Sequence, residues 1–267
     1  MKTVLITGAY SGVGNQLVNK FLNENYKIVA LDIKDIEEKE NLLFYNCNIT
    51  DDNRLNEIKK DLNNKNIIFD LIINVAGIHK MASLVESDND VLKSVINVNL
   101  VGTMLVNKTF YSLLKPKGKI IIVTSEVASF DPLPFNGLYN ISKSALDCYS
   151  QALRQELNLL DQKVITIRPG AIKTPLSDNS LTDTSTLANE TILYKNQAGN
   201  FLDLVKNFMG TPMEAKKLAD FIYKVSIKKH NKLIYKKHTN VGLYLLSILP
   251  KRLQCYIIKK LLNRKRK

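Results

Sequence analysis

Short apolar runs alternate along this chain with longer segments in which apolar residues recur every three or four positions. The short runs predict β-strands at residues 2–6, 27–32, 42–46, 69–75, 118–124 and 163–168. The longer segments predict helices near residues 13–25, 51–63, 88–115 and 138–161. Because strands and helices take turns in this order, we expect an α/β fold, a doubly wound parallel sheet with helices on both faces.

One domain accounts for most of this pattern. With 267 residues the chain is long enough for a single large α/β domain with a substantial core. We assign residues 1–235 to that domain and residues 236–267 to a basic amphipathic C-terminal tail. Residues 175–212 show no clear periodicity and are rich in Ser, Thr and Asn, so we expect a loop there.

The charge is distributed unevenly between these two parts. Residues 1–220 hold 24 Lys or Arg and 25 Asp or Glu, whereas residues 221–267 hold 14 Lys or Arg and no acid. The apolar run 241–249 is too short to cross a bilayer. An apolar face beside many cations is typical of a helix that lies on an anionic membrane. That face comprises Leu243, Leu246, Leu249, Leu253, Ile257 and Leu261.

Two other partners for the tail stay open. The same features suit a helix that packs against the main domain or at a dimer contact, with a solvated basic end. Nucleic acid is disfavoured, because few aromatic side chains accompany the cations and stacking on bases needs them.

A glycine turn joins the first predicted strand to the first predicted helix. Gly8, Gly12 and Gly14 let the backbone turn tightly and approach a pyrophosphate, and the helix N-terminus supplies free N–H groups. Asp32 ends the next strand, about 20 residues further on, where a carboxylate accepts hydrogen bonds from the ribose hydroxyls of NAD. It repels the extra phosphate of NADP, for which Lys34 is the nearest cation. We therefore expect a Rossmann-like site that binds NAD rather than NADP.

Tyr139 and Lys143 lie four residues apart at the start of a predicted helix, so they share one face of it. A cation about 4 Å from the phenol oxygen, at an effective dielectric constant of about 20, stabilises the ionised form of the tyrosine by roughly 4 kcal/mol. That is enough to bring the phenol pKa from about 10 towards 7, where acid–base catalysis is most effective. Such a pair alone is often only an exposed tyrosine beside a solvated lysine, and it gains weight from the glycine turn.

Together these motifs resemble the short-chain dehydrogenase/reductase family in its single-domain form. The resemblance covers residues 2 to about 235, and five motifs occur in the family's order. The motifs are Thr7-Gly8-x-x-x-Gly12-x-Gly14, Asn74-Val-Ala-Gly77, Asn97-Val-Asn99, Tyr139-x-x-x-Lys143 and Arg168-Pro-Gly170-Ala-Ile-Lys-Thr174.

The resemblance implies roles for individual residues. Tyr139 would be the general acid/base, and Lys143 would lower its pKa and bind the nicotinamide ribose. Ser125 would donate to the substrate oxygen, and Asn99 would hold a water between Lys143 and solvent. Residues 175–212 would be a mobile substrate loop. The implied cofactor-binding residues are Gly8, Ser11, Gly12, Val13, Gly14, Asp32, Asn48, Ile49, Asn74, Ala76, Gly77, Tyr139, Lys143, Pro169, Gly170, Ile172 and Thr174.

Two positions depart from the family pattern. The family's serine stands thirteen residues before the tyrosine, which here is Glu126, whereas Ser125 stands fourteen before it. Thr124 and Ser129 are lesser candidates for the oxygen-binding hydroxyl. Asn48 replaces a common aspartate that faces the adenine amino group, and its amide oxygen can still accept that hydrogen bond.

These residues lead to an expected function. We expect an oxidoreductase that transfers a hydride between NAD(H) and an alcohol or ketone, and apolar Leu133, Pro134 and Phe135 favour a lipid-, sterol- or retinoid-like substrate. A 3-oxoacyl carrier-protein reductase is the alternative enzyme, although Asp32 disfavours the NADPH that such enzymes usually take. A non-catalytic dinucleotide-sensing protein is the alternative of another class, and Glu126 is the feature that suits it.

Assembly and location follow from the same residues. The resemblance implies a homodimer or homotetramer. We expect no metal site, because the three histidines lack ligand spacing. The first strand begins at residue 2 without a signal sequence, so we expect a cytoplasmic protein, in peripheral contact with a membrane through its tail.

Overall fold

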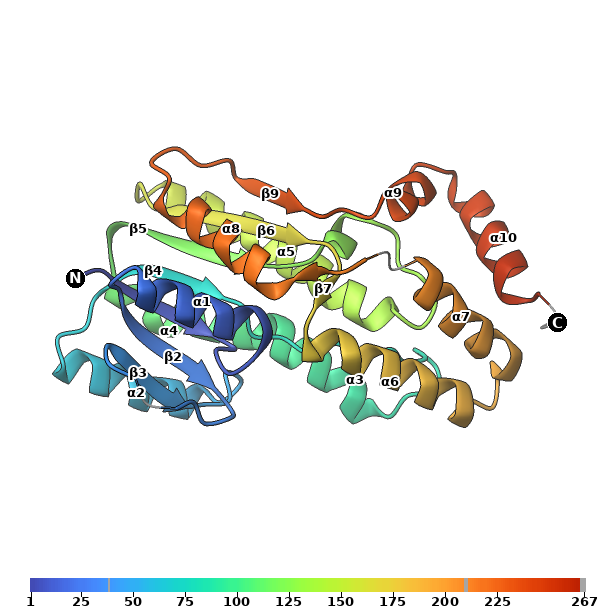
Figure 1. Cartoon of the computed structure of the whole chain (residues 1–267), viewed down its shortest axis with the longest axis horizontal. Coiled ribbons are helices and arrows are strands. Elements are labelled where there is room, and N and C mark those ends of the chain that lie inside the picture. The colour runs from blue at the N-terminus through green and yellow to red at the C-terminus, as the bar shows by residue number, and fades with distance from the viewer. Residues whose placement is uncertain (38, 209–210, 265–267) are drawn as a thin grey trace.

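The computed structural model describes residues 1–37, 39–208 and 211–264, and its centre is a parallel sheet of seven strands (Figure 1). The strands lie in the order β3-β2-β1-β4-β5-β6-β9. Their bounds are β1 (Thr3–Thr7), β2 (Lys27–Asp32), β3 (Leu42–Asn46), β4 (Phe69–Asn74), β5 (Leu114–Val123), β6 (Lys163–Pro169) and β9 (Ile234–Lys237). This confirms the doubly wound parallel sheet.

Sequence reasoning missed the edge strand β9. It pairs with β6 through Lys237, so the sheet extends two residues into the region assigned to the tail. Two further strands of two residues each, β7 (Ile172–Lys173) and β8 (Met213–Glu214), pair with one another beyond the main sheet.

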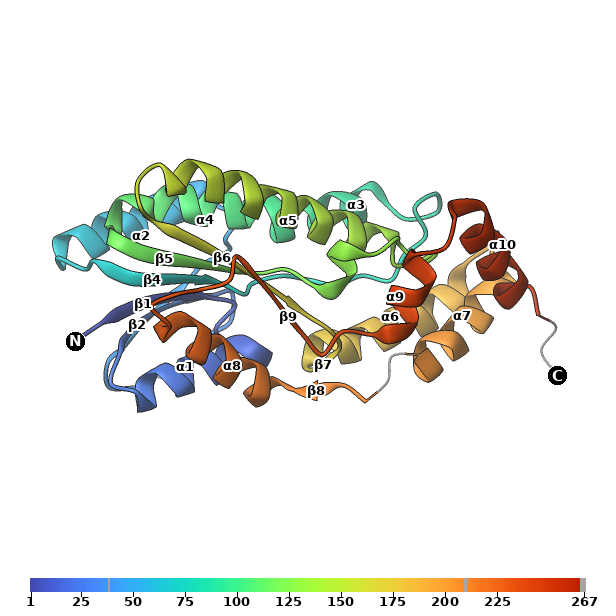
Figure 2. The ribbon, with the colours of Figure 1, turned by 90° about the horizontal axis from the view of Figure 1, so that it is seen from above.

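Helices cover both faces of the sheet (Figure 2). One face carries α1 (Gly12–Asn23) and α8 (Ala215–Ile227), and the other carries α2 (Asp52–Asn64), α4 (Thr103–Phe110) and α5 (Gly137–Asn158). Side chains alternate along each strand, so that Val4 and Ile6 of β1 pack under α1 while Leu5 packs under α2 and α4. The apolar runs of the inner strands are therefore buried on both sides, as in other parallel sheets, whereas the edge strands β3 and β9 are only partly buried.

The helix predicted over residues 88–115 is interrupted. It consists of α3 (Asn89–Ile96), a π-helical turn at Asn97–Gly102, α4, and a short 3-10 turn at Tyr111–Leu113. The last predicted residues of the helix, 114 and 115, belong to β5 instead. A π-helical turn inside a helix is rare and frequently marks a functional site.

Four helices gather beyond the carboxyl ends of the strands and form one end of the molecule (Figure 1). They are α6 (Pro175–Glu190), α7 (Lys195–Phe208), α9 (Val241–Ser247) and α10 (Lys251–Leu262). The prediction of a loop at residues 175–212 is wrong for most of that range, because α6 and α7 occupy it. Residues 209–210 of this range lie outside the described residues. Sequence reasoning missed α7, which packs with both α6 and α10.

Candidate active site

The glycine turn forms a tight cradle at the carboxyl end of β1. Gly8 and Gly12 have φ values of +68° and +55°, which only glycine adopts without strain. A Cβ on Gly14 would lie 1.9 Å from the carbonyl oxygen of Gly8, so this position admits no side chain. The turn follows β1, which has β2 on one side in the sheet and β4 on the other. The strand order reverses here, and doubly wound sheets bind nucleotides at such a switch point. The backbone therefore fits the diphosphate of a dinucleotide.

Asp32 lies beside this cradle. Its Oδ2 accepts a hydrogen bond from the Tyr10 backbone N–H at 2.9 Å, and its Oδ1 accepts one from the Lys34 backbone N–H at 3.1 Å. The Lys34 ammonium stands 5.1 Å from the centre of the Tyr10 ring. The carboxylate predicted to receive the ribose hydroxyls thus lies beside the glycine turn, and the Lys34 side chain lies over the neighbouring Tyr10 ring.

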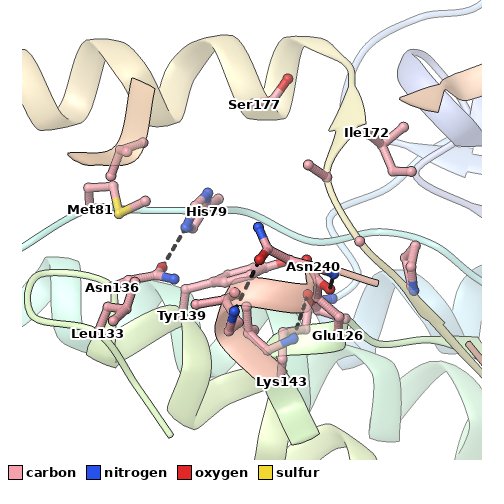
Figure 3. Close-up of a pocket in the computed structure, with 18 of the residues that line it drawn as sticks. His79, Met81, Glu126, Leu133, Asn136, Tyr139, Lys143, Ile172, Ser177 and Asn240 are labelled. Atoms are coloured by element: carbon pink, nitrogen blue, oxygen red, sulfur yellow. Dashed lines mark hydrogen bonds between the residues drawn. The ribbon is translucent and has the colours of Figure 1, made fainter. Parts of the chain in front are cut away.

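Tyr139 and Lys143 project from the first turns of α5 into the same cavity, as predicted from their spacing (Figure 3). Ser125, two residues after the end of β5, lines the same cavity, and hydrogen bonding from its side chain lowers the Tyr139 pKa. Lys143 is 4% exposed and donates to the Val123 carbonyl at 3.4 Å. The structure therefore brings the three expected groups together.

The pKa values differ from the expectation. Burial raises the pKa of Tyr139 to about 12, which outweighs the hydrogen bond from Ser125. Burial also lowers the pKa of Lys143 to about 8, and its nitrogen lies 5.8 Å from the centre of the Tyr139 ring. The argument from one nearby cation omitted the desolvation of both groups. The phenol consequently keeps its proton at neutral pH.

Asn99 is fully buried within the π-helical turn. Its Oδ1 accepts from the Ile78 N–H at 2.7 Å, and its Nδ2 donates to the Ile78 carbonyl at 2.9 Å. The same amide donates to Ser142 on α5 at 2.9 Å. A Cβ on Gly77 would lie 3.0 Å from Asn99 Oδ1 and 3.4 Å from Lys143 Nζ. Asn99 thus fixes the loop after β4 beside Lys143.

The candidate hydroxyl groups near Tyr139 point in different directions. Ser125 faces Tyr139, whereas Thr124 Oγ1 lies 3.3 Å from Asp147 and from the Ile167 carbonyl, away from the phenol. Ser129 is exposed. Glu126 does not replace the serine, because its carboxylate turns towards Gly170 and accepts the Asn240 backbone N–H at 2.6 Å. One residue of extra loop between Ser125 and Tyr139 accommodates the longer spacing.

The other predicted cofactor residues fall into two groups. Several line the cavity, and they are Val13, Gly77, Pro169, Gly170, Ile172 and Thr174. Ser11 precedes α1 as its N-cap, and Ala76 packs against Gly8. Asn48 accepts from Thr50, and buried Ile49 packs against Gly102. Asn74 is buried and donates to Asn107 on α4 at 2.9 Å, so it ties β4 to a helix rather than facing the cavity.

A single cavity of about 640 Å³ reaches from Tyr139 to the C-terminal tail. Its lining is largely apolar, and the tail supplies much of it. The tail residues that line it include Leu243, Leu246, Leu249, Ile257 and Leu261. These are five of the six residues assigned to a membrane-binding face, and that assignment is therefore corrected: they form the wall of the cavity.

Sequence reasoning missed His79 and Asn240. The His79 ring lies 4.0 Å from the Tyr139 ring, centre to centre, and its Nε2 lies 2.8 Å from Asn136 Oδ1 (Figure 3). Burial lowers the His79 pKa. In the view of Figure 3, Tyr139 lies between this pair and the hydrogen bond from Asn240 to Glu126. The position of His79 in the loop after a parallel strand was a usable signal, since such loops carry site residues.

Glu126 gives a first testable prediction. Burial raises its pKa, so protonation stabilises the fold below the unfolded pKa, and this contribution is lost as the pH rises through the higher folded pKa. Glu126→Gln keeps an oxygen for Asn240 but does not ionise. We expect its free energy of unfolding to change less than that of the wild type between about pH 4 and about pH 7. Urea titrations at both pH values measure the difference, with exposed Glu57→Gln as the control. Equal pH dependence in Glu126→Gln and the wild type would contradict the prediction.

The described residues contain no group of three His, Cys, Asp or Glu side chains placed to hold a metal ion. Within the same ranges, no helix combines the length and hydropathy needed to cross a bilayer.

Comparisons with known proteins match this geometry. The family model for short chain dehydrogenases matches residues 2–185. The NADPH-dependent 1-acyldihydroxyacetone phosphate reductase of Schizosaccharomyces pombe is 33% identical over 188 residues, which are 67% of this chain and 63% of that protein. A probable short-chain type dehydrogenase/reductase of Helicobacter pylori, VdlC, is 33% identical over 63% of this chain and 64% of that protein. The match thus spans less than two-thirds of the length of either relative.

A solved structure shows the same fold. A short chain dehydrogenase family protein from Francisella tularensis subsp. tularensis superposes with a TM-score of 0.75. The sequences are 22% identical, and the superposition covers 91% of this chain and 99% of that one.

Proposed function

The chain belongs to the short chain dehydrogenase family, and on that premise we propose that it is an oxidoreductase that interconverts an apolar alcohol and its ketone with NAD(H). The observation that carries the proposal is that Ser125, Tyr139 and Lys143 line the same apolar cavity together. The glycine cradle at Gly8, with Asp32 next to it, supplies a dinucleotide site that leads to the same cavity.

The chain's own residues would divide the work as follows. The bound nicotinamide supplies or accepts the hydride. Tyr139 holds the proton that the substrate oxygen gains or loses. Ser125 donates to the same oxygen and stabilises the charge that develops there. Lys143 and Asn99 hold the pocket floor behind the phenol. Because the Tyr139 pKa is about 12, the phenol carries its proton at neutral pH, and this form suits reduction of a ketone.

The cavity supports an apolar substrate. Apolar side chains from α7, α9 and α10 line the space outward from Tyr139, and His79 and Asn136 are polar groups near the phenol. A substrate with one carbonyl or hydroxyl and a lipid-, sterol- or retinoid-like body would match this distribution. The test is a panel of ketones and secondary alcohols with NAD(H), followed by the absorbance of the reduced nicotinamide. Tight dinucleotide binding without turnover of any member would favour a dinucleotide sensor.

Cofactor choice is the second prediction. The yeast relative is NADPH-dependent, whereas Asp32 stands where it would repel the 2′-phosphate of NADP. We expect a higher kcat/KM with NADH than with NADPH, and we expect Asp32→Ala to reduce that ratio by about 10-fold or more, since one charge contact contributes on the order of 1.5–3 kcal/mol. Initial rates with both cofactors measure it. Lys34→Ala is the matched variant, and a wild-type preference for NADPH that Lys34→Ala removes would reverse the assignment.

Assembly and location complete the proposal. We propose a homodimer or homotetramer, supported by the exposed apolar side chains of Val101, Met104 and Ile141 on adjoining helices. Sedimentation velocity measures the state. We place the enzyme in the cytoplasm, in peripheral contact with a membrane.

A further inference from the structure

The short helix α9 is apolar on two opposite faces. Leu243 and Leu246 line the cavity. On the outward side, Tyr244 and Leu245 of α9 and Ile248 directly after it are 52%, 54% and 62% exposed, and Leu245 and Ile248 also border the cavity. A helix that is apolar all round is normally buried on every side. Within the described part of the chain nothing covers the outer side of α9.

The exposed surface continues onto α10. Leu253 and Tyr256 are 42% and 60% exposed, and Arg252, Lys259 and Lys260 are exposed as well. Their spacings of three, four and seven residues place these five on one face of the helix, opposite the side that packs on α7. We name the exposed surface of the two helices the outer tail face. It consists of Tyr244, Leu245, Ile248, Arg252, Leu253, Tyr256, Lys259 and Lys260.

The cations of this face are available to an external partner. Among the described residues no carboxylate pairs with Arg252, Lys259 or Lys260, whereas neighbouring Lys251 forms an ion pair with Asp131. The whole segment 221–267 contains no acid. Aliphatic and tyrosine side chains interspersed with cations match the boundary between the acyl chains and the anionic headgroups of a lipid bilayer. A second copy of the same face would bring like charges together.

The cavity opens at this face. Leu245 and Ile248 line the cavity and are nevertheless more than half exposed, so they border its mouth. The inner side of the same helix forms the wall that leads towards Tyr139. The apolar part of the outer tail face at Leu245 and Ile248 thus borders the place at which an apolar molecule would enter.

We infer that the outer tail face docks on an anionic lipid bilayer and holds the mouth of the cavity against the lipid. An apolar substrate then passes between the bilayer and Tyr139 without crossing water. The role of the cavity rests on the proposed function, whereas the docking itself does not.

The test uses the full chain and phosphatidylcholine vesicles with and without phosphatidylserine. We expect co-sedimentation only with the anionic vesicles, weakened by salt. Each cation near such a surface contributes about fivefold in affinity, so Arg252→Glu/Lys259→Glu/Lys260→Glu should lower vesicle affinity by about 100-fold or more. Tyr244→Ser/Leu253→Ser/Tyr256→Ser should lower it by at least about 10-fold. None of these six residues lines the cavity.

Matched controls lie outside the tail. Lys60→Glu/Lys108→Glu/Lys229→Glu reverses three exposed cations, and Leu159→Ser/Leu160→Ser removes two exposed leucines after α5. Both should bind vesicles as the wild type does. Turnover of a water-soluble ketone should be unchanged in all variants, whereas turnover of an apolar ketone presented in anionic vesicles should fall with binding.

The outcomes separate the two proposals. Vesicle binding without turnover of any substrate would contradict the proposed function and support the docking. Normal turnover with equal binding to neutral and anionic vesicles, or with outer-face variants that bind like the wild type, overturns the docking. An outer-face variant that changes the sedimentation coefficient without changing vesicle binding identifies the face as a contact between copies, and it likewise overturns the docking.

Discussion

Tyr139→Phe should lower turnover by about 10²–10⁴-fold while leaving NAD(H) affinity almost unchanged. The substitution removes the hydroxyl that we propose exchanges a proton with the substrate oxygen, and it keeps the ring that packs against His79. Because the phenol is buried and protonated at neutral pH, its loss removes a proton donor rather than a charge. Steady-state kinetics with the best substrate of the panel, together with fluorescence titration of NADH, measure both quantities.

Tyr149→Phe is the matched control for that variant. Tyr149 lies on the same helix, ten residues further on. Its hydroxyl accepts a hydrogen bond from the Asn107 side chain, and it does not line the cavity. Its loss should affect stability slightly and turnover hardly at all. Near-normal turnover in Tyr139→Phe would mean that the proton comes from another group, and His79 would then be the first to examine.

Ser125→Ala should lower turnover by about 10²–10³-fold, the usual cost of one donor to a developing oxyanion. The serine also lowers the Tyr139 pKa through its hydrogen bond, so its removal raises that pKa further. We therefore expect the basic limb of the pH–rate profile that reports Tyr139 to move to higher pH. A merely structural role of Ser125 would not move it.

Ser129→Ala is the matched control for Ser125→Ala, because it removes a hydroxyl from the turn that follows Ser125. Ser129 lies in the same 3-10 segment as the residues after Ser125 but is exposed and does not line the cavity. Its substitution should leave turnover and the pH profile unchanged. An unchanged Ser125→Ala variant would remove Ser125 from the mechanism, and Thr124 would be tested next.

Short-range patterns determined much of this protein. The bounds of β2 and β3 agree with the apolar runs at residues 27–32 and 42–46. β2 lies inside the sheet and is buried on both faces, which requires an apolar run, whereas β3 is a half-buried edge strand. The Gly8–Gly14 turn and the shared helical face of Tyr139 and Lys143 are likewise local. A positive φ and an i, i+4 spacing depend on a few neighbouring residues.

The remaining features depend on residues distant in the sequence. The apolar face of the tail gave no indication of its partner, and folding placed Leu246 and Ile257 over the cavity rather than against a membrane. The direction of the Glu126 side chain depends on Asn240, which lies more than a hundred residues away in the sequence. Lys143 alone led us to expect a lowered Tyr139 pKa, but burial, which depends on the whole packed chain, raises it. The sequence by itself thus determined the sheet, the glycine cradle and the chemical groups. The tertiary structure decided how those groups ionise and which segment encloses them. Desolvation and long-range packing made that difference, because neither has a local signature in a single sequence.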